Sequence, residues 1–184
     1  MIGKGAGVMK ADEVTYLLRH YRHDWMNQLQ LIKGYASMDK LDKVKEKVNE
    51  IVTQSQQESH LMNLKADRVT LWILRFNTLH DQFRLTYTVE GQADLSSYDY
   101  TLSLALQSAF DTIQSNANEH SLYKGSIMFQ LEDERRVSLS FTGDFLKREL
   151  DWKPLENLPM VDYTSYRNDD ESTTYTILFD LNER

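Results

Sequence analysis

The chain has 184 residues, of which 41% are hydrophobic and 11% aromatic, and this composition is typical of a globular protein rather than a disordered one. It contains no cysteine, which excludes disulfides, thiol catalysis and cysteine-ligated metals. A formal net charge of −7 provides no general basic surface for nucleic acid, and no apolar run approaches the roughly 18 residues needed to span a bilayer. We therefore expect a cytoplasmic protein without nucleic-acid or membrane partners.

The N-terminal third of the chain predicts two long helices. Residues 1–10 should form a flexible tail, and residues 11–64 an antiparallel helical hairpin, because only a short turn separates the two helical patterns. Asp12 is a favourable N-cap for the first helix. The expected helices cover residues 12–37 and 41–62.

An apolar stripe recurs at helical spacing along the first helix. It contains Val14, Leu18, Tyr21, Trp25, Leu29 and Ile32. Two helices alone cannot cover this stripe and its counterpart on the second helix. The sequence therefore predicts a homodimer in which two hairpins form a four-helix bundle. The alternative is that the hairpin folds back onto its own C-terminal domain.

Residues 65–184 alternate between strand and helix patterns and predict an α/β sandwich, with one helical layer over a mixed sheet. The expected helices cover residues 69–82 and 98–118, and the expected strands cover 85–91, 126–131, 137–141 and 173–181. The segment 146–168 contains both prolines, Pro154 and Pro159, and shows no clear pattern. Together with the hairpin, this domain predicts an α+β protein.

A second stripe of the first helix is polar and lies on a different face from the apolar one. It contains His20, His23, Asn27, Gln30 and Gly34. An exposed imidazole can attack a phosphoryl group and hold it as a phosphoramidate. Around His23, Arg19 and Arg22 could offset phosphoryl charge, Asp24 could orient the ring, and Asn27 could donate a hydrogen bond. From the residues alone, a solvated helix face that contains histidines by chance is the better explanation.

Three sequence segments change that balance. RHDWMNQLQLIKG, then ESHLMNLK after the hairpin, and DLSSYDY near the middle of the chain resemble the sporulation initiation phosphotransferase B family of endospore-forming bacilli. The match is specific over about residues 19–65 and looser beyond, mainly in pattern. The resemblance implies that His23, in the R-H-D-W motif, is the phosphorylated residue.

The resemblance also implies partners. A phosphorelay protein of this family receives a phosphoryl group from the aspartate of one response regulator and passes it to the aspartate of a second, in the control of sporulation initiation. Mg²⁺ is then expected in the partner regulator, and no cofactor in this chain. The expected docking surface on the first helix consists of Arg19, Arg22, Asn27, Gln30, Leu31 and Gly34.

An ATP-dependent histidine kinase fragment is the main alternative, and it requires a nucleotide site. After Gly7 the glycines are Gly34, Gly91, Gly125 and Gly143, so no glycine-rich loop is available to hold phosphates. FTGDF at 141–145 does not match the expected glycine box, and SNANEH at 115–120 resembles the kinase asparagine box only faintly. We therefore expect a degenerate kinase-type ATPase domain without nucleotide chemistry. A non-catalytic module that binds a regulator stays open as a third reading.

The remaining histidines offer no metal-ligand spacing. His60, His80 and His120 are scattered and lack a second histidine or an acidic pair at a suitable distance along the chain. The sequence therefore predicts no metal site.

Overall fold

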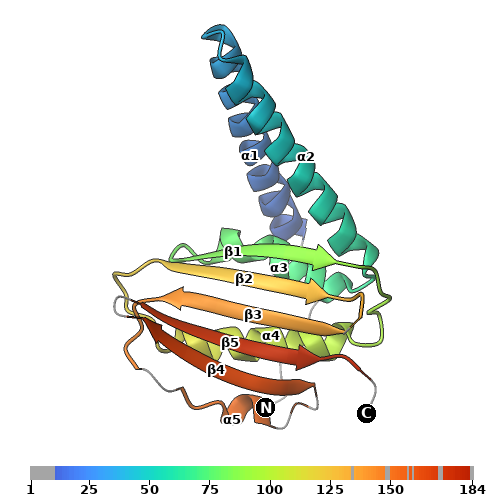
Figure 1. Ribbon diagram of the computed structural model, residues 1–184, viewed down its shortest axis with the longest axis vertical. Coiled ribbons are helices and arrows are strands. Elements are labelled where there is room, and N and C mark those ends of the chain that lie inside the picture. The colour runs from blue at the N-terminus through green and yellow to red at the C-terminus, as the bar shows by residue number, and fades with distance from the viewer. Residues whose placement is uncertain are drawn as a thin grey trace. The chain divides into compact units, whose positions relative to one another are not determined.

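The computed structural model describes residues 11–133, 135–147, 150–156, 158, 160–169 and 172–182. The tail expected over residues 1–10 lies outside these residues. Two long helices precede a domain of helices and strands, which confirms the predicted α+β class (Figure 1). The chain divides into two compact units between Ser55 and Gln56.

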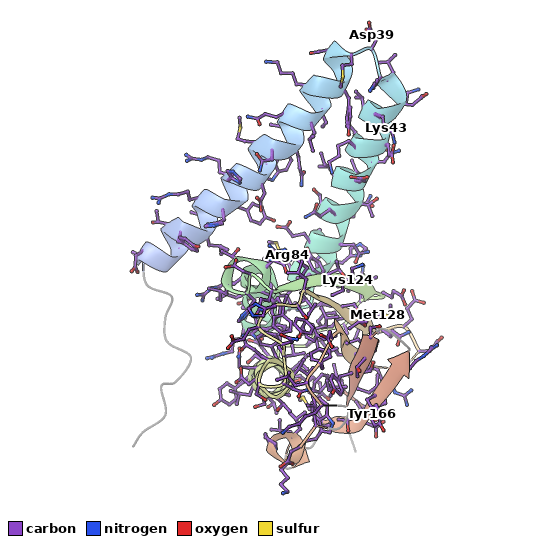
Figure 2. All side chains as sticks on the ribbon, turned by 90° about the vertical axis from the view of Figure 1, so that its left-hand side faces the viewer. Asp39, Lys43, Arg84, Lys124, Met128 and Tyr166 are labelled. Atoms are coloured by element: carbon purple, nitrogen blue, oxygen red, sulfur yellow. The ribbon has the colours of Figure 1, made fainter. Side chains whose placement is uncertain are left out.

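The first unit is built on the predicted hairpin. Helix α1 covers Ala11–Ser37 and helix α2 covers Leu41–Asn63, and the chain reverses at Asp39, which lies at the hairpin tip (Figure 2). Asp39 has a φ of 54°, in the left-handed region that aspartate tolerates better than most residues. The prediction that Asp12 caps α1 is wrong, because α1 already includes Ala11 and Asp12 lies inside the helix.

The last turns of α2 belong to the second unit. Leu61 is fully buried there, and the side-chain oxygen of Gln57 accepts a hydrogen bond from the backbone N–H of Val89 at 2.7 Å. The units therefore divide inside α2, whereas the sequence placed the domain boundary between residues 64 and 65. The difference arises because α2 continues as one helix while its packing partners change.

The second unit is an α/β sandwich with a five-stranded mixed sheet. Its strand order is β1-β2-β3-β5-β4, with β1 and β2 parallel and all other neighbours antiparallel. The strands are β1 Phe83–Glu90, β2 Tyr123–Gln130, β3 Arg136–Gly143, β4 Val161–Asp169 and β5 Ser172–Asp180. The sequence predicted four of these strands. It missed β4, and it also missed the short helix α5 (Lys153–Glu156) in the same segment.

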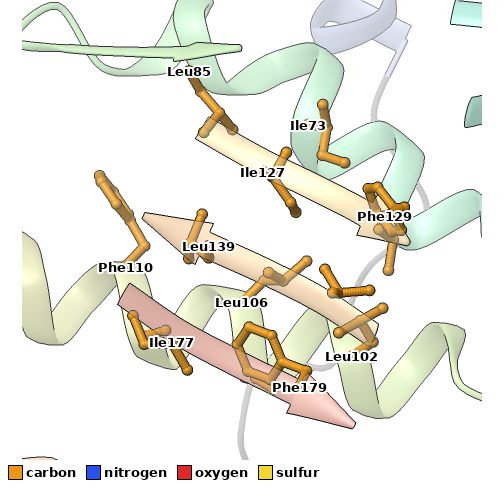
Figure 3. Close-up of a cluster of buried hydrophobic side chains, with 14 of the residues drawn as sticks. Ile73, Leu85, Leu102, Leu106, Phe110, Ile127, Phe129, Leu139, Ile177 and Phe179 are labelled. Carbon is orange, nitrogen blue, oxygen red and sulfur yellow. The ribbon is translucent and has the colours of Figure 1, made fainter. Parts of the chain in front are cut away.

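Two helices cover one face of the sheet, α3 (Asp67–Leu79) and α4 (Asp99–Gln114) (Figure 1). This confirms the predicted single helical layer over a mixed sheet. The core lies between the helices and the sheet, where Leu102, Leu106 and Phe110 of α4 are fully buried (Figure 3). Strand residues alternate strictly between buried and exposed positions in β2, so the sheet contributes one face to this core.

The free edge of β1 is paired by side chains instead of by another strand. The amide of Asn77 on α3 accepts a hydrogen bond from the N–H of Leu85 at 2.7 Å and donates to the C=O of the same residue at 2.9 Å. Gln57 pairs with Val89 further along the same edge. Two side-chain amides thus satisfy backbone groups that an edge strand usually exposes.

Within the described ranges, none of the helices combines the length and the apolar character needed to cross a membrane.

His80 follows α3 directly, and its half-buried ring packs against two phenylalanines. Ring centroids are 4.7 Å apart for His80 and Phe76, and 4.5 Å apart for His80 and Phe110. Burial lowers the pKa of His80, and the nearby carboxylate of Asp111 raises it by a smaller amount. Folding therefore favours the neutral imidazole.

We predict that His80→Gln loses less unfolding free energy than the wild type when the pH is lowered. The unfolded chain takes up the His80 proton before the folded chain does, so the stability that this residue contributes is present above the ordinary pKa near 6.5 and is lost as the pH falls. Urea unfolding at pH 7 and pH 5 measures the change. The difference in unfolding free energy between the two pH values should be smaller in His80→Gln than in the wild type. His60→Gln, at an exposed position of α2, controls for loss of an imidazole. Equal differences in all three proteins would contradict the prediction.

Candidate functional site

One face of α1 carries the residues predicted to form the site. At about 100° per residue, the members of the polar stripe fall within about 60° of His23 around the helix axis. They are His20, Asn27, Gln30 and Gly34, and Arg19 lies in the same angular range. Three further predicted residues flank this face at about 80° to 100°. They are Arg22, Asp24 and Leu31. The helix therefore brings all the predicted site residues to one side.

The His23 side chain is open to solvent. It is 70% exposed, and the neighbouring Asp24 side chain is 73% exposed. Arg19 and Arg22 are also exposed. A phosphoryl group delivered by another protein can therefore reach the ring without any rearrangement of α1.

Two polar side chains contact the same nitrogen of His23. Nδ1 lies 3.4 Å from a carboxylate oxygen of Asp24 and 3.2 Å from the amide nitrogen of Asn27. Nδ1 cannot donate to Asp24 and accept from Asn27 at the same time, so the two contacts correspond to different tautomers. When Nδ1–H faces Asp24, the lone pair is on Nε2, and that is the nitrogen able to act as a nucleophile.

The predicted docking residues lie further along the same face. Gln30 is exposed, and Leu31 is 49% exposed. A Cβ atom added at Gly34 would meet no atom within 4 Å. The packing of the described chain therefore does not require glycine at this position, although glycine costs a helix about 1 kcal/mol relative to alanine.

The predicted apolar stripe lies on the opposite face of α1 and is uncovered. Its exposed members include Leu18 at 63%, Trp25 at 45% and Leu29 at 47% exposure. No described side chain of α1 falls in the buried class. On α2, Leu41, Val48 and Val52 are exposed as well. Uncovered apolar side chains in this number, arranged at helical spacing, are typical of a surface that packs against another molecule or another part of the chain.

The segment SNANEH is used for packing in the second unit. Asn116 is 3% exposed, and its amide donates to the C=O of Lys147 at 3.0 Å and to the hydroxyl of Tyr175 at 3.2 Å. Asn118 donates from its side-chain amide to the carboxylate of Asp144 at 3.3 Å. The two asparagines thus tie the end of α4 to the segment that follows β3.

The segment FTGDF is used in the same way. A Cβ atom at Gly143 would overlap the ring of Tyr123, so the glycine allows that ring to cross β3. The Tyr123 hydroxyl accepts from the N–H of Asn118 at 2.6 Å and donates to the C=O of Asp144 at 2.6 Å. The glycine and the aspartate of this segment therefore have structural contacts inside the domain. Among the residues that the structure describes, no group of three or more histidine, aspartate or glutamate side chains is placed to hold a metal ion.

The structure adds one site feature that the sequence did not reveal. His20 was placed on the stripe without a role, and its ring contacts Tyr16 one turn earlier. An i, i+4 histidine–tyrosine pair is visible in the sequence, but the spacing alone does not show which ring nitrogen is engaged.

Comparisons with solved structures give distant likenesses. The histidine kinase domain of the blue-light-activated histidine kinase of Erythrobacter litoralis EL346 is 8% identical with a TM-score of 0.45, over 62% of this chain and 60% of that one. The histidine kinase AdeS of Acinetobacter baumannii is 10% identical with a TM-score of 0.39, over 88% of this chain and 98% of that one. The present chain thus spans about 60% of the first of these structures.

Comparisons of sequence are more specific. A family model described as the alpha-helical domain of SpoOB-type sensor kinases matches residues 5–64. Sporulation initiation phosphotransferase B of Bacillus subtilis (strain 168) is 36% identical over 138 residues, which cover 73% of this chain and 72% of that protein. With identity at this level over most of both proteins, the chain belongs to the sporulation initiation phosphotransferase B family.

Proposed function

We propose that this chain is a phosphotransferase of the sporulation phosphorelay that carries a phosphoryl group on His23. It accepts the group from the aspartyl phosphate of one response regulator and passes it to the aspartate of a second. Family membership supports the phosphotransferase activity. The observation that carries the choice of residue is the exposed His23 ring, whose Nδ1 lies within reach of the Asp24 carboxylate, the contact that leaves the lone pair on Nε2.

The first transfer is a displacement at phosphorus. The Nε2 lone pair of His23 forms the N–P bond while the P–O bond to the regulator's carboxylate breaks, and the bonding electrons leave with that carboxylate. The ring then carries a positive charge, which the carboxylate of Asp24 offsets through Nδ1–H. Arg19 and Arg22 are the cations on this helix that can approach the transferring oxygens. Mg²⁺ held by the regulator would neutralise further charge there.

The second transfer reverses the geometry. A carboxylate oxygen of the second regulator forms the new P–O bond, and the N–P bond electrons return to Nε2. Because Nδ1 keeps its proton near Asp24, the leaving ring is a neutral imidazole rather than an anion. The same contact therefore assists both transfers. The chain's own task is alignment and charge compensation, which is what phosphoryl transfer mainly needs.

An ATP-dependent kinase is the weaker reading of the second unit. The residues of its SNANEH and FTGDF segments make buried or structural contacts: Asn116 with Lys147 and Tyr175, and Gly143 beneath Tyr123. These contacts support a phosphoryl source other than ATP. The second unit would then have a structural role.

The regulators would dock on the stripe around His23. Gln30, Leu31 and Gly34 extend it beyond the histidine, and Gly34 leaves room where a side chain would otherwise project. Since this glycine is not needed by the chain's own packing, close approach of a partner is the reason we assign to it.

We further propose that the chain is a homodimer. The exposed apolar stripe of α1 is centred about 180° from His23, so pairing two hairpins through it would leave both histidines accessible. A four-helix bundle is the arrangement that covers such stripes on two hairpins.

We expect His23→Ala to abolish phosphoryl transfer. The wild type should acquire acid-labile, alkali-stable label from a ³²P-labelled response regulator and none from labelled ATP. His60→Ala, which removes an exposed histidine of α2, should label like the wild type. Label that persists in His23→Ala would overturn the assignment. Label from ATP alone would indicate a kinase, and no label from either source would indicate a binding module.

The two contacts of Nδ1 should have opposite effects on the His23 tautomer. Asn27→Ala removes the donor to Nδ1 and should increase the Nδ1–H form, whereas Asp24→Asn should increase the Nε2–H form. Ring ¹⁵N chemical shifts measure both. Asp24→Asn should also slow transfer about tenfold, since a hydrogen bond to a charged group contributes about 1.5 kcal/mol. Unchanged ¹⁵N shifts in both variants would contradict this account of the site.

The dimer can be tested by light scattering, which should give twice the chain mass of 21.6 kDa. Trp25→Glu places a charge in the proposed interface, where an unpaired buried charge costs several kcal/mol, and should yield monomers. Gln30→Glu, on the opposite face, is the matched control and should stay dimeric. A monomeric wild type at micromolar concentration would refute the bundle.

A further inference from the structure

His20 is the other histidine on the stripe, and its ring is held in one orientation. Its Nδ1 lies 3.1 Å from the backbone C=O of Tyr16. A carbonyl oxygen can only accept, so Nδ1 carries a proton and donates it. The ring also packs on the ring of Tyr16, with centroids 4.2 Å apart and planes inclined at 52°.

This arrangement distinguishes His20 from His23. Nδ1 of His23 faces both a carboxylate and an amide, so either tautomer of its ring finds a partner. Nδ1 of His20 faces a carbonyl alone, which leaves Nε2 as the nitrogen available to an outside group. With Nδ1 already paired, a protonated His20 presents one N–H donor in a fixed direction.

The helix places His20 one turn before His23 on the same face. His20 precedes His23 by three residues, a spacing that sets Cβ atoms about 5–6 Å apart. Side chains on a helix lean toward its N-terminus, so the His23 ring lies over the turn that contains His20. A phosphoryl group on Nε2 of His23 brings three oxygens and negative charge to this turn.

We propose that His20 is a further catalytic residue: as an imidazolium, with Nδ1–H on the Tyr16 C=O, it donates a hydrogen bond from Nε2–H to a phosphoryl oxygen during transfer to and from His23. This inference rests on the phosphotransferase function proposed above. The contacts with Tyr16 already restrict the His20 ring, so less conformational entropy is lost when the donor binds the phosphoryl group. Arg19, one turn before His23, supplies positive charge, and the doubly protonated His20 supplies both charge and a directed donor.

Three substitutions separate this role from a structural one. A glutamine amide can replace the Nε2 donor but not the hydrogen bond from Nδ1 to the Tyr16 C=O. An asparagine amide can replace that Nδ1 hydrogen bond but not the Nε2 donor. Phenylalanine keeps only the ring packing on Tyr16. A catalytic role predicts that His20→Gln retains most activity and that His20→Asn and His20→Phe lose about tenfold in transfer rate at saturating regulator. A structural role predicts the reverse order for the two amides.

The assay is transfer of label from a phosphorylated response regulator to the full chain, with helix content checked by circular dichroism. His60→Asn is the matched control, and the regulator concentration giving half-maximal rate should not change in any His20 variant. If His20→Asn transfers at the wild-type rate while His23→Ala does not transfer, the inference about His20 is wrong and the proposed function stands. If the wild type takes no label, the proposed function itself fails. Label that survives His23→Ala but is lost in His20→Asn would make His20 the carrier and overturn both.

Discussion

Helix α1 presents two different surfaces on opposite faces, the polar stripe around His23 and the apolar stripe. With 3.6 residues per turn, the apolar stripe that includes Trp25 and Leu29 falls about 180° from His23. Any partner that covers the apolar stripe therefore leaves the histidine in solvent. The proposed association through the apolar stripe would thus leave the His23 ring exposed.

Helix α2 contributes residues to both units. Gln57 and Leu61, in the last turns of α2, bond to or pack within the sandwich, and the helix is continuous from the hairpin tip to these residues. Inside the sandwich, the segments that would matter most for a nucleotide are used for packing. Asn116 is buried and bonded to Lys147 and Tyr175, and Tyr123 crosses β3 over Gly143.

The sequence predicted most of the regular elements, because α1, α2, α4 and the central strands carry strong periodic patterns. It failed where long-range contacts decide the structure. Helix α3 begins at Asp67 rather than at the predicted Val69, since the carboxylate of Asp99 accepts from the N–H groups of Arg68 and Val69 at about 3 Å. Strand β4 was missed because an edge strand buries few of its side chains and so lacks the alternation of a central strand.

The candidate site was predictable to a different extent. His23 and its neighbours could be placed on one face from helix periodicity, and the structure keeps them there. The choice of ring nitrogen could not be predicted, because it depends on side-chain rotamers: Asp24 and Asn27 both reach Nδ1, and His20 turns back to Tyr16. Their roles in transfer stay predictions. Spacing along a helix shows which residues are neighbours, but not which atoms meet.

The side-chain amide of Asn77 affects whether a strand of another chain can add to the sheet at β1. By pairing with both the N–H and the C=O of Leu85, it acts as a one-residue strand and closes this edge of the sheet. Strand addition, the first step in domain swapping and in fibre growth, would have to displace an intramolecular partner at β1.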